Sequence, residues 1–213
     1  MMNKSLEFLV KFSYIVYRLI LFNGETMVHL LVQIDVWLFS LINHTLANPL
    51  FDLIMPWVTD LNHWKIPILL IWLALIVFGK KTGRLVAVLI IFTILLSDQT
   101  SSFVIKPLVG RIRPCNALAD VRLLVSCPGS FSFPSSHAVN IFATATLFSY
   151  FYQRYCYFFY GFASLIAYSR VYVGVHYPFD VIAGAFWGMC CGLIVAGIFQ
   201  YLVSRINLKK RWF

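Results

Sequence analysis

Two histidines and an aspartate have the spacing of a nucleophile with its supporting groups. His137 closes the tetrapeptide Pro134-Ser-Ser-His, and His176 precedes Asp180 by four residues, with Pro178 between them. Pro178 suits the start of a helix, so Asp180 would lie in the first turn and reach back to one ring nitrogen of His176. The other nitrogen would then be free to attack. We therefore predict His176 as nucleophile, Asp180 as its orienting group and His137 as general acid.

Three cations accompany these residues. Lys106 and Arg113 lie seven residues apart, and Arg170 stands six residues before His176. Arginine offers forked donors to a tetrahedral anion, and lysine offers a point charge. The three side chains are predicted to surround a phosphate.

The segment before His137 predicts a helix start. Proline is favoured at the first helical position, so we expect the helix to begin at Pro134. The amides of Ser135, Ser136 and His137 would then point at the same phosphate, together with the positive end of the helix dipole.

The composition indicates a membrane protein. Of the 213 residues, 61% are hydrophobic and only 12% are charged, against about 45–50% and about 25% in soluble domains. The net charge of +9 does not indicate nucleic acid, because no basic run is interleaved with aromatic residues. Basic residues in short loops between apolar spans set topology instead.

The predicted fold is an all-α polytopic bundle in residues 51–213. Its five core spans are expected over residues 66–78 (continuing back through Trp57), 85–103, 134–152, 157–175 and 178–203. Asp98 in the second of these is expected to face protein and bond to a neighbouring helix. Four glycines in the last span would allow close helix packing: Gly184, Gly188, Gly192 and Gly197.

Residues 1–50 are predicted to form one or two further helices, over residues 6–22 and 27–46. Both stretches are apolar but contain ionisable side chains. Amphipathic helices at the membrane interface are favoured over short spans.

The loop charges predict an orientation. One face would hold eight basic residues: Lys80, Lys81, Arg84, Arg154, Arg205, Lys209, Lys210 and Arg211. The other would hold six: Lys65, Lys106, Arg111, Arg113, Arg122 and Arg170. Lys106, Arg113 and Arg170 are predicted phosphate ligands, so only three of the six would serve topology, against eight on the first face. Because cytoplasmic loops carry the excess of basic residues, the first face is expected in the cytoplasm. The site is therefore expected on the extracytoplasmic face.

Taken in order, the three motifs resemble the type 2 phosphatidic acid phosphatase family. They read Lys-x6-Arg-Pro from Lys106, Pro-Ser-x-His from Pro134 and Ser-Arg-x5-His-x3-Asp from Ser169 to Asp180. The family shares its fold and site with glucose-6-phosphatase and the vanadium-dependent haloperoxidases. One position departs from the pattern: Ser136 replaces the usual glycine, and its side chain is expected to narrow the pocket.

The resemblance implies a metal-free, two-step hydrolysis through a phosphohistidine, without a cofactor. It implies a catalytic set of His176, His137 and Asp180. The phosphate ligands it implies are Lys106, Arg113, Ser135 and Arg170, to which the helix start adds the amide of Ser136. The implied partners are the bilayer and a lipid phosphate.

Other polar residues receive structural interpretations. His29, His44 and His63 are expected to serve packing or the interface. Arg111 and Arg122 are expected to contact the loop or lipid headgroups.

The five cysteines fall into two groups. Cys156, Cys190 and Cys191 lie in or beside spans and are expected to be small buried residues. Cys115 and Cys127 flank the loop between the first two motifs, where an oxidising compartment could join them; a disulfide and two free thiols both stay open. A zinc site is not expected, because the loop pair lacks further Cys or His ligands nearby.

Within the resembled family, the compact chain is similar to bacterial enzymes of the inner or plasma membrane. Undecaprenyl pyrophosphate is the favoured substrate, with phosphatidylglycerol phosphate, phosphatidic acid and lipid A phosphate as alternatives. A lipid phosphotransferase would use the same residues. A non-enzymatic sensor or transporter would have lost a chemical residue, and haloperoxidase relatives are generally soluble; neither suits this sequence.

Overall fold

The computed structural model describes residues 26–205 and divides the chain into two compact units, Met1–Leu38 and Phe39–Phe213. The predicted helix over residues 6–22 lies outside the described residues. The helix predicted over residues 27–46 is observed as Thr26–Thr45, which is long and apolar enough to cross a membrane. Whether it lies at the interface or spans, and with it the division at residue 50, stays a prediction.

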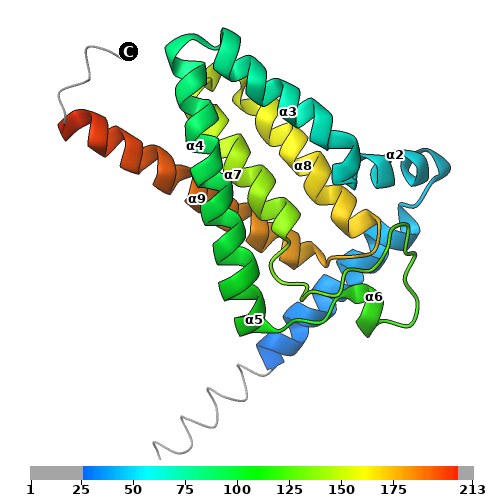
Figure 1. The fold of residues 1–213 in the computed structure, drawn as a ribbon. Coiled ribbons are helices and arrows are strands. Elements are labelled where there is room, and N and C mark those ends of the chain that lie inside the picture. Colours follow the sequence, from blue (N-terminus) through cyan, green and yellow to red (C-terminus); the bar gives the residue numbers. More distant parts are fainter. Residues whose placement is uncertain (1–25, 206–213) are drawn as a thin grey trace, which may run out of the picture. The chain divides into compact units, whose positions relative to one another are not determined.

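The regular secondary structure of the second unit is all helical, with no strand among residues 39–205 (Figure 1). The all-α fold is therefore confirmed, and four helices among residues 26–205 are long and apolar enough to cross a membrane. Its elements are η1 (Leu41–Thr45), α2 (Pro49–Thr59), α3 (Leu61–Phe78), α4 (Lys80–Gln99), η2 (Thr100–Ile105), α5 (Lys106–Val109), α6 (Pro114–Ala117), α7 (Ser136–Phe151), η3 (Gln153–Tyr155), α8 (Cys156–Tyr172) and α9 (Pro178–Arg205).

All five predicted core spans exist as helices, with two corrections at their starts. The first does not continue back through Trp57, because α2 ends at Thr59 and the extended residue Asp60 caps α3 with its carboxylate. The third begins at Ser136 rather than Pro134. Ser135 is the extended cap residue there, and its amide is held by the carbonyl of Asp180 at 3.0 Å.

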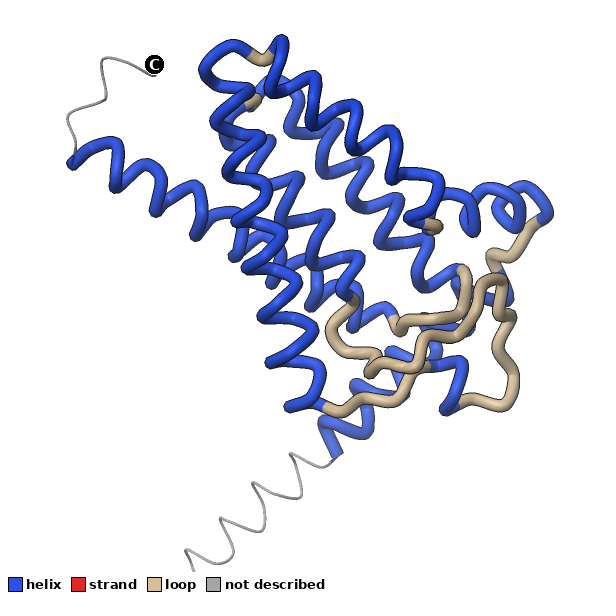
Figure 2. The backbone as a smooth tube through the Cα atoms, in the orientation of Figure 1, coloured by secondary structure: helices blue, strands red, loops and turns tan. Residues whose placement is uncertain are grey.

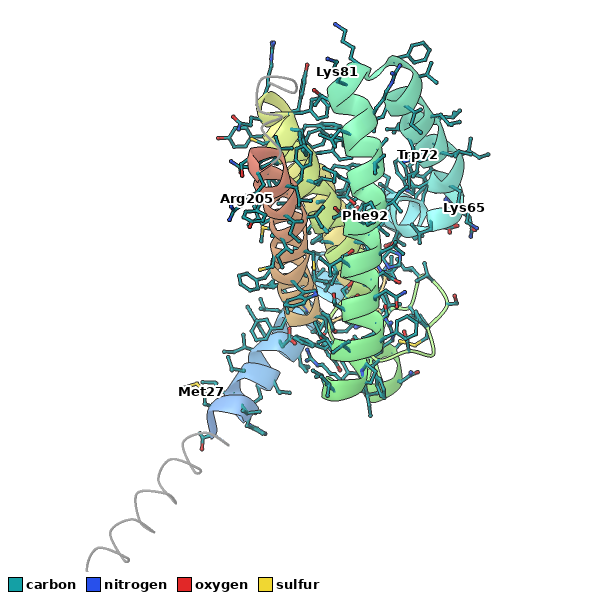
Figure 3. The ribbon with its side chains drawn as sticks, turned by 60° about the vertical axis from the view of Figure 1, so that its left-hand side comes forward. Met27, Lys65, Trp72, Lys81, Phe92 and Arg205 are labelled. Atoms are coloured by element: carbon teal, nitrogen blue, oxygen red, sulfur yellow. A yellow bond between two sulfur atoms is a disulfide. The ribbon has the colours of Figure 1, made fainter. Side chains whose placement is uncertain are left out.

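The apolar helices use their surfaces differently. No residue of α3 is buried, and its aliphatic side chains face outward, as lipid contact requires. Figure 3 shows Lys81 at the turn between α3 and α4 and Lys65 near the opposite end of α3, with Trp72 between them. The apolar surface between these charged ends is the part that faces lipid.

Helices α7 and α9 pack at close range through glycine. A side chain at Gly184, Gly188 or Gly192 would overlap α7, since an added Cβ at Gly188 would lie 2.2 Å from the carbonyl oxygen of Val139. The predicted role of these three glycines is confirmed. Gly197 has nothing within 4 Å of such an atom, so the prediction is wrong there.

Candidate active site

The three predicted motifs meet at one end of the helices. Figure 2 shows the loops before α7 and between α8 and α9 gathered at this end, beside the turn that follows α5. Gly110 ends α5 in the left-handed conformation (φ 62°), which glycine adopts without a Cβ penalty, and so turns the chain toward Arg113. Gly174, at φ 89°, makes the corresponding turn before His176.

The His176 ring is fixed at both nitrogens. The Arg113 guanidinium lies 2.9 Å from Nε2, and Asp180 Oδ2 lies 3.5 Å from Nδ1. A guanidinium can only donate, so Nε2 must be the acceptor and the ring proton must sit on Nδ1, toward the carboxylate. His176 is only 1% exposed, and this burial lowers the pKa of the imidazole, against the raising effect of the Asp180 hydrogen bond. The ring is therefore neutral, with its lone pair on Nε2.

Asp180 is held by three donors that spacing did not predict. Arg111 donates to Oδ1 at 2.7 Å, and its guanidinium lies over the Tyr177 ring, 4.0 Å from the ring centroid. The Ser132 hydroxyl donates to Oδ2, and the Tyr177 amide donates to the same oxygen at 2.9 Å. The Ser132 hydroxyl also lies 3.4 Å from Nδ1 of His176. These contacts orient the carboxylate, and only the fold brings them together.

Arg111 and Arg122 were expected to contact the loop or lipid headgroups, but both form ion pairs with carboxylates of the protein. Arg111 is paired with the buried Asp180. Arg122 is paired with Asp52 at 2.5 Å and donates to the Asn43 carbonyl at 2.9 Å. Both arginines hold helices or side chains of the protein itself.

Lys106 and Arg113 are buried and hold the loop before α7. Lys106 Nζ donates to the Phe131 carbonyl at 2.9 Å. Arg113 donates to the carbonyl of Ser130 at 2.7 Å and to its hydroxyl at 2.9 Å. Both cations are 5% exposed or less, and both bond to the loop that also presents Ser132 to Asp180.

Arg170 and Ser135 carry polar atoms that the protein does not satisfy. Arg170 donates from Nη1 to Thr59 Oγ1 at 2.5 Å, yet its Nε is buried without a hydrogen-bond partner. The Ser135 hydroxyl is also buried and unpartnered. Across residues 26–205, Ser149 has the one other buried side-chain atom in this state. Two of the three such atoms thus belong to predicted phosphate ligands.

The start of α7 corrects one predicted donor. The Ser135 amide cannot face a phosphate, because it is bonded to Asp180, whereas the amides of Ser136 and His137 lie in the first turn, which has no helical acceptors. The Ser136 hydroxyl lies 3.3 Å from that of Ser102 in η2. Its side chain therefore bonds to the neighbouring helix.

Two smaller predictions can be checked at the same end. Cys115 and Cys127 form a disulfide, which closes the loop between the first two motifs. Asp98 accepts a hydrogen bond from Asn140 of α7 at 3.1 Å, which confirms its interhelical role.

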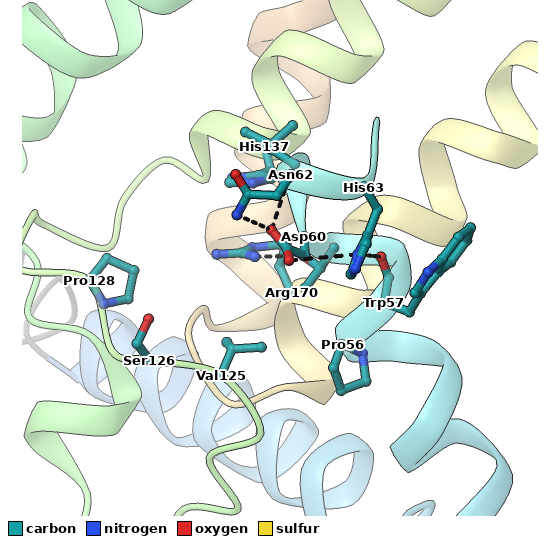
Figure 4. Close-up of a pocket in the computed structure, with 12 residues that line it drawn as sticks. Pro56, Trp57, Asp60, Asn62, His63, Val125, Ser126, Pro128, His137 and Arg170 are labelled. Carbon is teal, nitrogen blue, oxygen red and sulfur yellow. Dashed lines mark hydrogen bonds and ion pairs between the residues drawn. The ribbon is translucent and has the colours of Figure 1, made fainter. Parts of the chain in front are cut away.

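A cavity of about 560 Å³ adjoins the site (Figure 4). His137 and Arg170 line it, and the junction of α2 and α3 contributes Asp60, Asn62 and His63. The packing role predicted for His63 is incomplete. Its ring does stack on Trp57, with centroids 5.5 Å apart, but it also lines this cavity.

A family model for the PAP2 superfamily matches residues 86–204, the part of the chain that contains all three motifs and the loops between them. The chain belongs to the PAP2 superfamily. It is accordingly a membrane lipid phosphatase, a phosphoric monoester hydrolase, as its motifs predict.

Individual relatives agree with this membership. The chain is 33% identical over 190 residues to a lipid A 4'-phosphatase of Bacteroides thetaiotaomicron, covering 85% of this chain and 84% of that protein. The crystal structure of Aquifex aeolicus LpxE aligns with a TM-score of 0.65 at 30% identity, over 76% of this chain and 94% of that one. The crystal structure of a PAP2 type phosphatidylglycerolphosphate phosphatase from Bacillus subtilis aligns with a TM-score of 0.61 at 25% identity, over 80% of this chain and 87% of that one.

Proposed function

We propose that this phosphatase hydrolyses a lipid phosphate at the extracytoplasmic face of a bacterial membrane, through a phosphohistidine on His176. The observation that carries the proposal is the fixed tautomer of His176. Nε2 accepts a hydrogen bond from Arg113 at 2.9 Å, and the guanidinium would have to transfer this hydrogen bond to a phosphate oxygen before Nε2 attacks. The oxygens of the transferred phosphate would then lie beside that guanidinium.

The reaction divides into two displacements at phosphorus. Nε2 of His176 attacks as the bond to the lipid oxygen breaks, and His137 gives that oxygen a proton. The developing charge on the imidazole is balanced by Asp180, which accepts the Nδ1 proton in a hydrogen bond. Water then attacks the phosphohistidine, gives its proton to His137 and releases inorganic phosphate.

Two buried donors without a hydrogen-bond partner support the assignment of Arg170 and Ser135 as phosphate ligands. A buried polar atom without a partner costs about 1–3 kcal/mol, and Arg170 and Ser135 each carry one. Phosphate oxygens would satisfy Arg170 Nε and the Ser135 hydroxyl. Lys106, Arg113 and the amides of Ser136 and His137 would complete the anion site.

The proposed chemistry uses no metal or cofactor. We expect turnover in EDTA to equal turnover without it. Inactivation by EDTA that only a divalent cation reverses would contradict this.

For the substrate, we infer a phosphate monoester on a lipid with a polar headgroup, of which lipid A phosphate is the first candidate. The extensive match to a lipid A 4'-phosphatase supports this choice. Phosphatidylglycerol phosphate is the second, by the structural likeness. Undecaprenyl pyrophosphate, which the compact length of the chain favoured in the sequence analysis, stays an alternative.

Rapid quenching with ³²P-labelled lipid tests the mechanism. We expect an acid-labile, alkali-stable label on a peptide that contains His176, formed faster than phosphate is released. His176→Ala should lose the label and at least about a thousandfold in kcat, while His137→Ala should slow turnover severely. Substantial turnover by purified, folded His176→Ala protein would overturn the proposal.

The same experiment separates hydrolysis from phosphotransfer. A phosphotransferase would pass the label to a second lipid and release little inorganic phosphate. Thin-layer analysis of the products gives the ratio directly.

A further inference from the structure

The cavity beside His137 is larger than the phosphate site needs. Its volume of about 560 Å³ falls within the range of small-molecule sites, about 300–1,000 Å³. A phosphate bound by Arg170 would occupy only one edge of it. The remainder lies between the α2–α3 junction and the loop that carries Ser126 and Pro128 (Figure 4).

The α2–α3 wall holds three polar side chains in position, next to the apolar Pro56, Trp57 and Leu61. Asp60 Oδ1 accepts from the Asn62 amide at 3.0 Å and from its side chain at 2.9 Å. His63 Nδ1 lies 3.3 Å from the Trp57 carbonyl and 3.6 Å from Asp60 Oδ2, and its ring stacks on Trp57. Polar groups held in this way suit a ligand that carries hydroxyl groups as well as apolar surface.

The opposite wall is also fixed. Val125, Ser126 and Pro128 flank Cys127, which is bonded to Cys115. The disulfide restricts the movement of this loop relative to α6. Both walls are therefore present before a ligand binds.

The chemistry of the site decides which part of the substrate enters. His137 protonates the leaving oxygen in the proposed mechanism, so the leaving group lies on the side of His137. Among the residues that line the cavity, Arg170 is the one permanent cation and is already assigned to the transferred phosphate, and Asp60 is the one carboxylate. A second phosphate in the leaving group would approach Asp60 with like charge, whereas hydroxyl groups can bond to it and to His63.

We propose that this cavity is a subsite for a leaving group that is hydroxylated and uncharged next to the scissile phosphate, a sugar or polyol headgroup, recognised by Asp60, Asn62 and His63. The inference rests on the proposed function and deepens it, because it names what distinguishes the preferred lipid phosphate. It ranks a sugar phosphate lipid above phosphatidic acid, which has no hydroxyl beside its phosphate, and above undecaprenyl pyrophosphate, whose leaving group is anionic.

The test compares kcat/KM for lipid A, phosphatidic acid and undecaprenyl pyrophosphate in Triton X-100 micelles, a detergent without a sugar. His63→Phe keeps the aromatic stack on Trp57 and removes the ring nitrogens. We expect it to lower the ratio of lipid A to phosphatidic acid about tenfold, the effect of losing a hydrogen bond to a hydroxyl. His44→Phe is the matched control, since His44 does not line the cavity and bonds to the Asp120 carbonyl.

Asp60→Asn tests the charge without removing the cap of α3, because asparagine also caps helices well. We expect the ratio of undecaprenyl pyrophosphate to phosphatidic acid to rise at least about threefold, as removal of a like charge requires. Unchanged ratios in both folded variants would overturn the subsite while leaving the phosphatase proposal standing. Absence of phosphate release from all three lipids by the wild type would instead overturn the proposed function.

Discussion

Ser132 occupies the position from which a hydroxyl can act on both halves of the proposed nucleophilic pair. It donates to Asp180 and lies 3.4 Å from Nδ1 of His176. Asp180 has two further donors in Arg111 and the Tyr177 amide. Ser132 is therefore a positioning residue, and its loss should weaken the orientation of the ring without removing it.

Ser132→Ala should lower kcat about tenfold with little change in KM, since a net hydrogen bond is worth about 0.5–1.5 kcal/mol. Ser132→Thr should recover part of the loss, because it restores the hydroxyl. Steady-state kinetics on a lipid phosphate, with the thermal unfolding temperature as a folding check, measures both. A purely structural role would instead lower stability and leave kcat per folded enzyme unchanged.

At the scale of elements, the α7–α9 contact aligns the two helix starts that carry the proposed acid and the orienting aspartate. The Ser135 amide bonds to the Asp180 carbonyl, and Gly184 lies against the Ser135 carbonyl, where an added Cβ would be 2.8 Å away. The close packing of α7 against α9 thus also sets the relative position of His137 and Asp180.

Gly188→Ala and Gly197→Ala should have opposite effects on stability. At Gly188 the new methyl group would overlap the Val139 carbonyl, so we expect a loss of about 1–3 kcal/mol. At Gly197 the space is open, and alanine should add about 0.5–1 kcal/mol by helix propensity. Denaturant unfolding in detergent measures both, and equal effects would contradict the close α7–α9 contact.

A second contact joins α2 to the end of α8. Asp52 accepts from the Tyr172 hydroxyl at 2.6 Å and from Arg122 at 2.5 Å. The Tyr172 hydrogen bond, followed by Arg122, lowers the pKa of Asp52 below 3.8. A lowered carboxyl pKa gives stability that is complete above the unfolded value and lost as pH falls through the folded value.

Asp52→Asn should therefore unfold at a lower temperature than the wild type at pH 7, and the two should converge as the pH falls below about 4. Thermal unfolding in detergent between pH 7 and pH 3 follows the difference. Asp60→Asn is a suitable control, because it removes a carboxylate that caps α3 and is not paired with arginine. A difference that stays constant over this range would argue against the ion pair.

At the scale of the whole molecule, the proposed orientation depends on which ends the basic residues share. The α3–α4 turn and the end of α7 lie together, since an added Cβ at Gly83 would be 3.6 Å from the Tyr152 hydroxyl. Lys80, Lys81 and Arg154 adjoin these two ends. Arg113 and Arg122 belong to the loops at the other ends of the helices. Of the other basic residues of the first face, Arg84 lies in the first turns of α4 and Arg205 ends α9. Lys209, Lys210 and Arg211 lie outside the described residues.

Cysteine labelling in spheroplasts tests this orientation. In a variant with alanine at positions 156, 190 and 191, we expect a membrane-impermeant maleimide to label Leu123→Cys and to spare Lys81→Cys. Both should react after the membrane is permeabilised, and the native disulfide should not react. The reverse pattern would put the site on the cytoplasmic side.

The sequence by itself determined the helical membrane class, the five core helices and the motifs with their order. These follow from hydropathy and from residue types whose chemistry is local: a proline and an aspartate in the first turn of α9 bring Asp180 within reach of His176 wherever the helix lies. The resemblance of the motifs to a known family also predicted the enzyme class. The roles of the site residues stay proposals at both levels.

Only the tertiary structure decided which distant groups complete the site. Ser132, Arg111 and Thr59 contact site residues that lie 48, 69 and 111 positions away in the chain. His63 joins the cavity because α2 and α3 break at Asp60. No spacing rule reaches across such separations, because these contacts depend on how helices pack. The packing in turn depends on where glycine lets the α7 and α9 backbones approach.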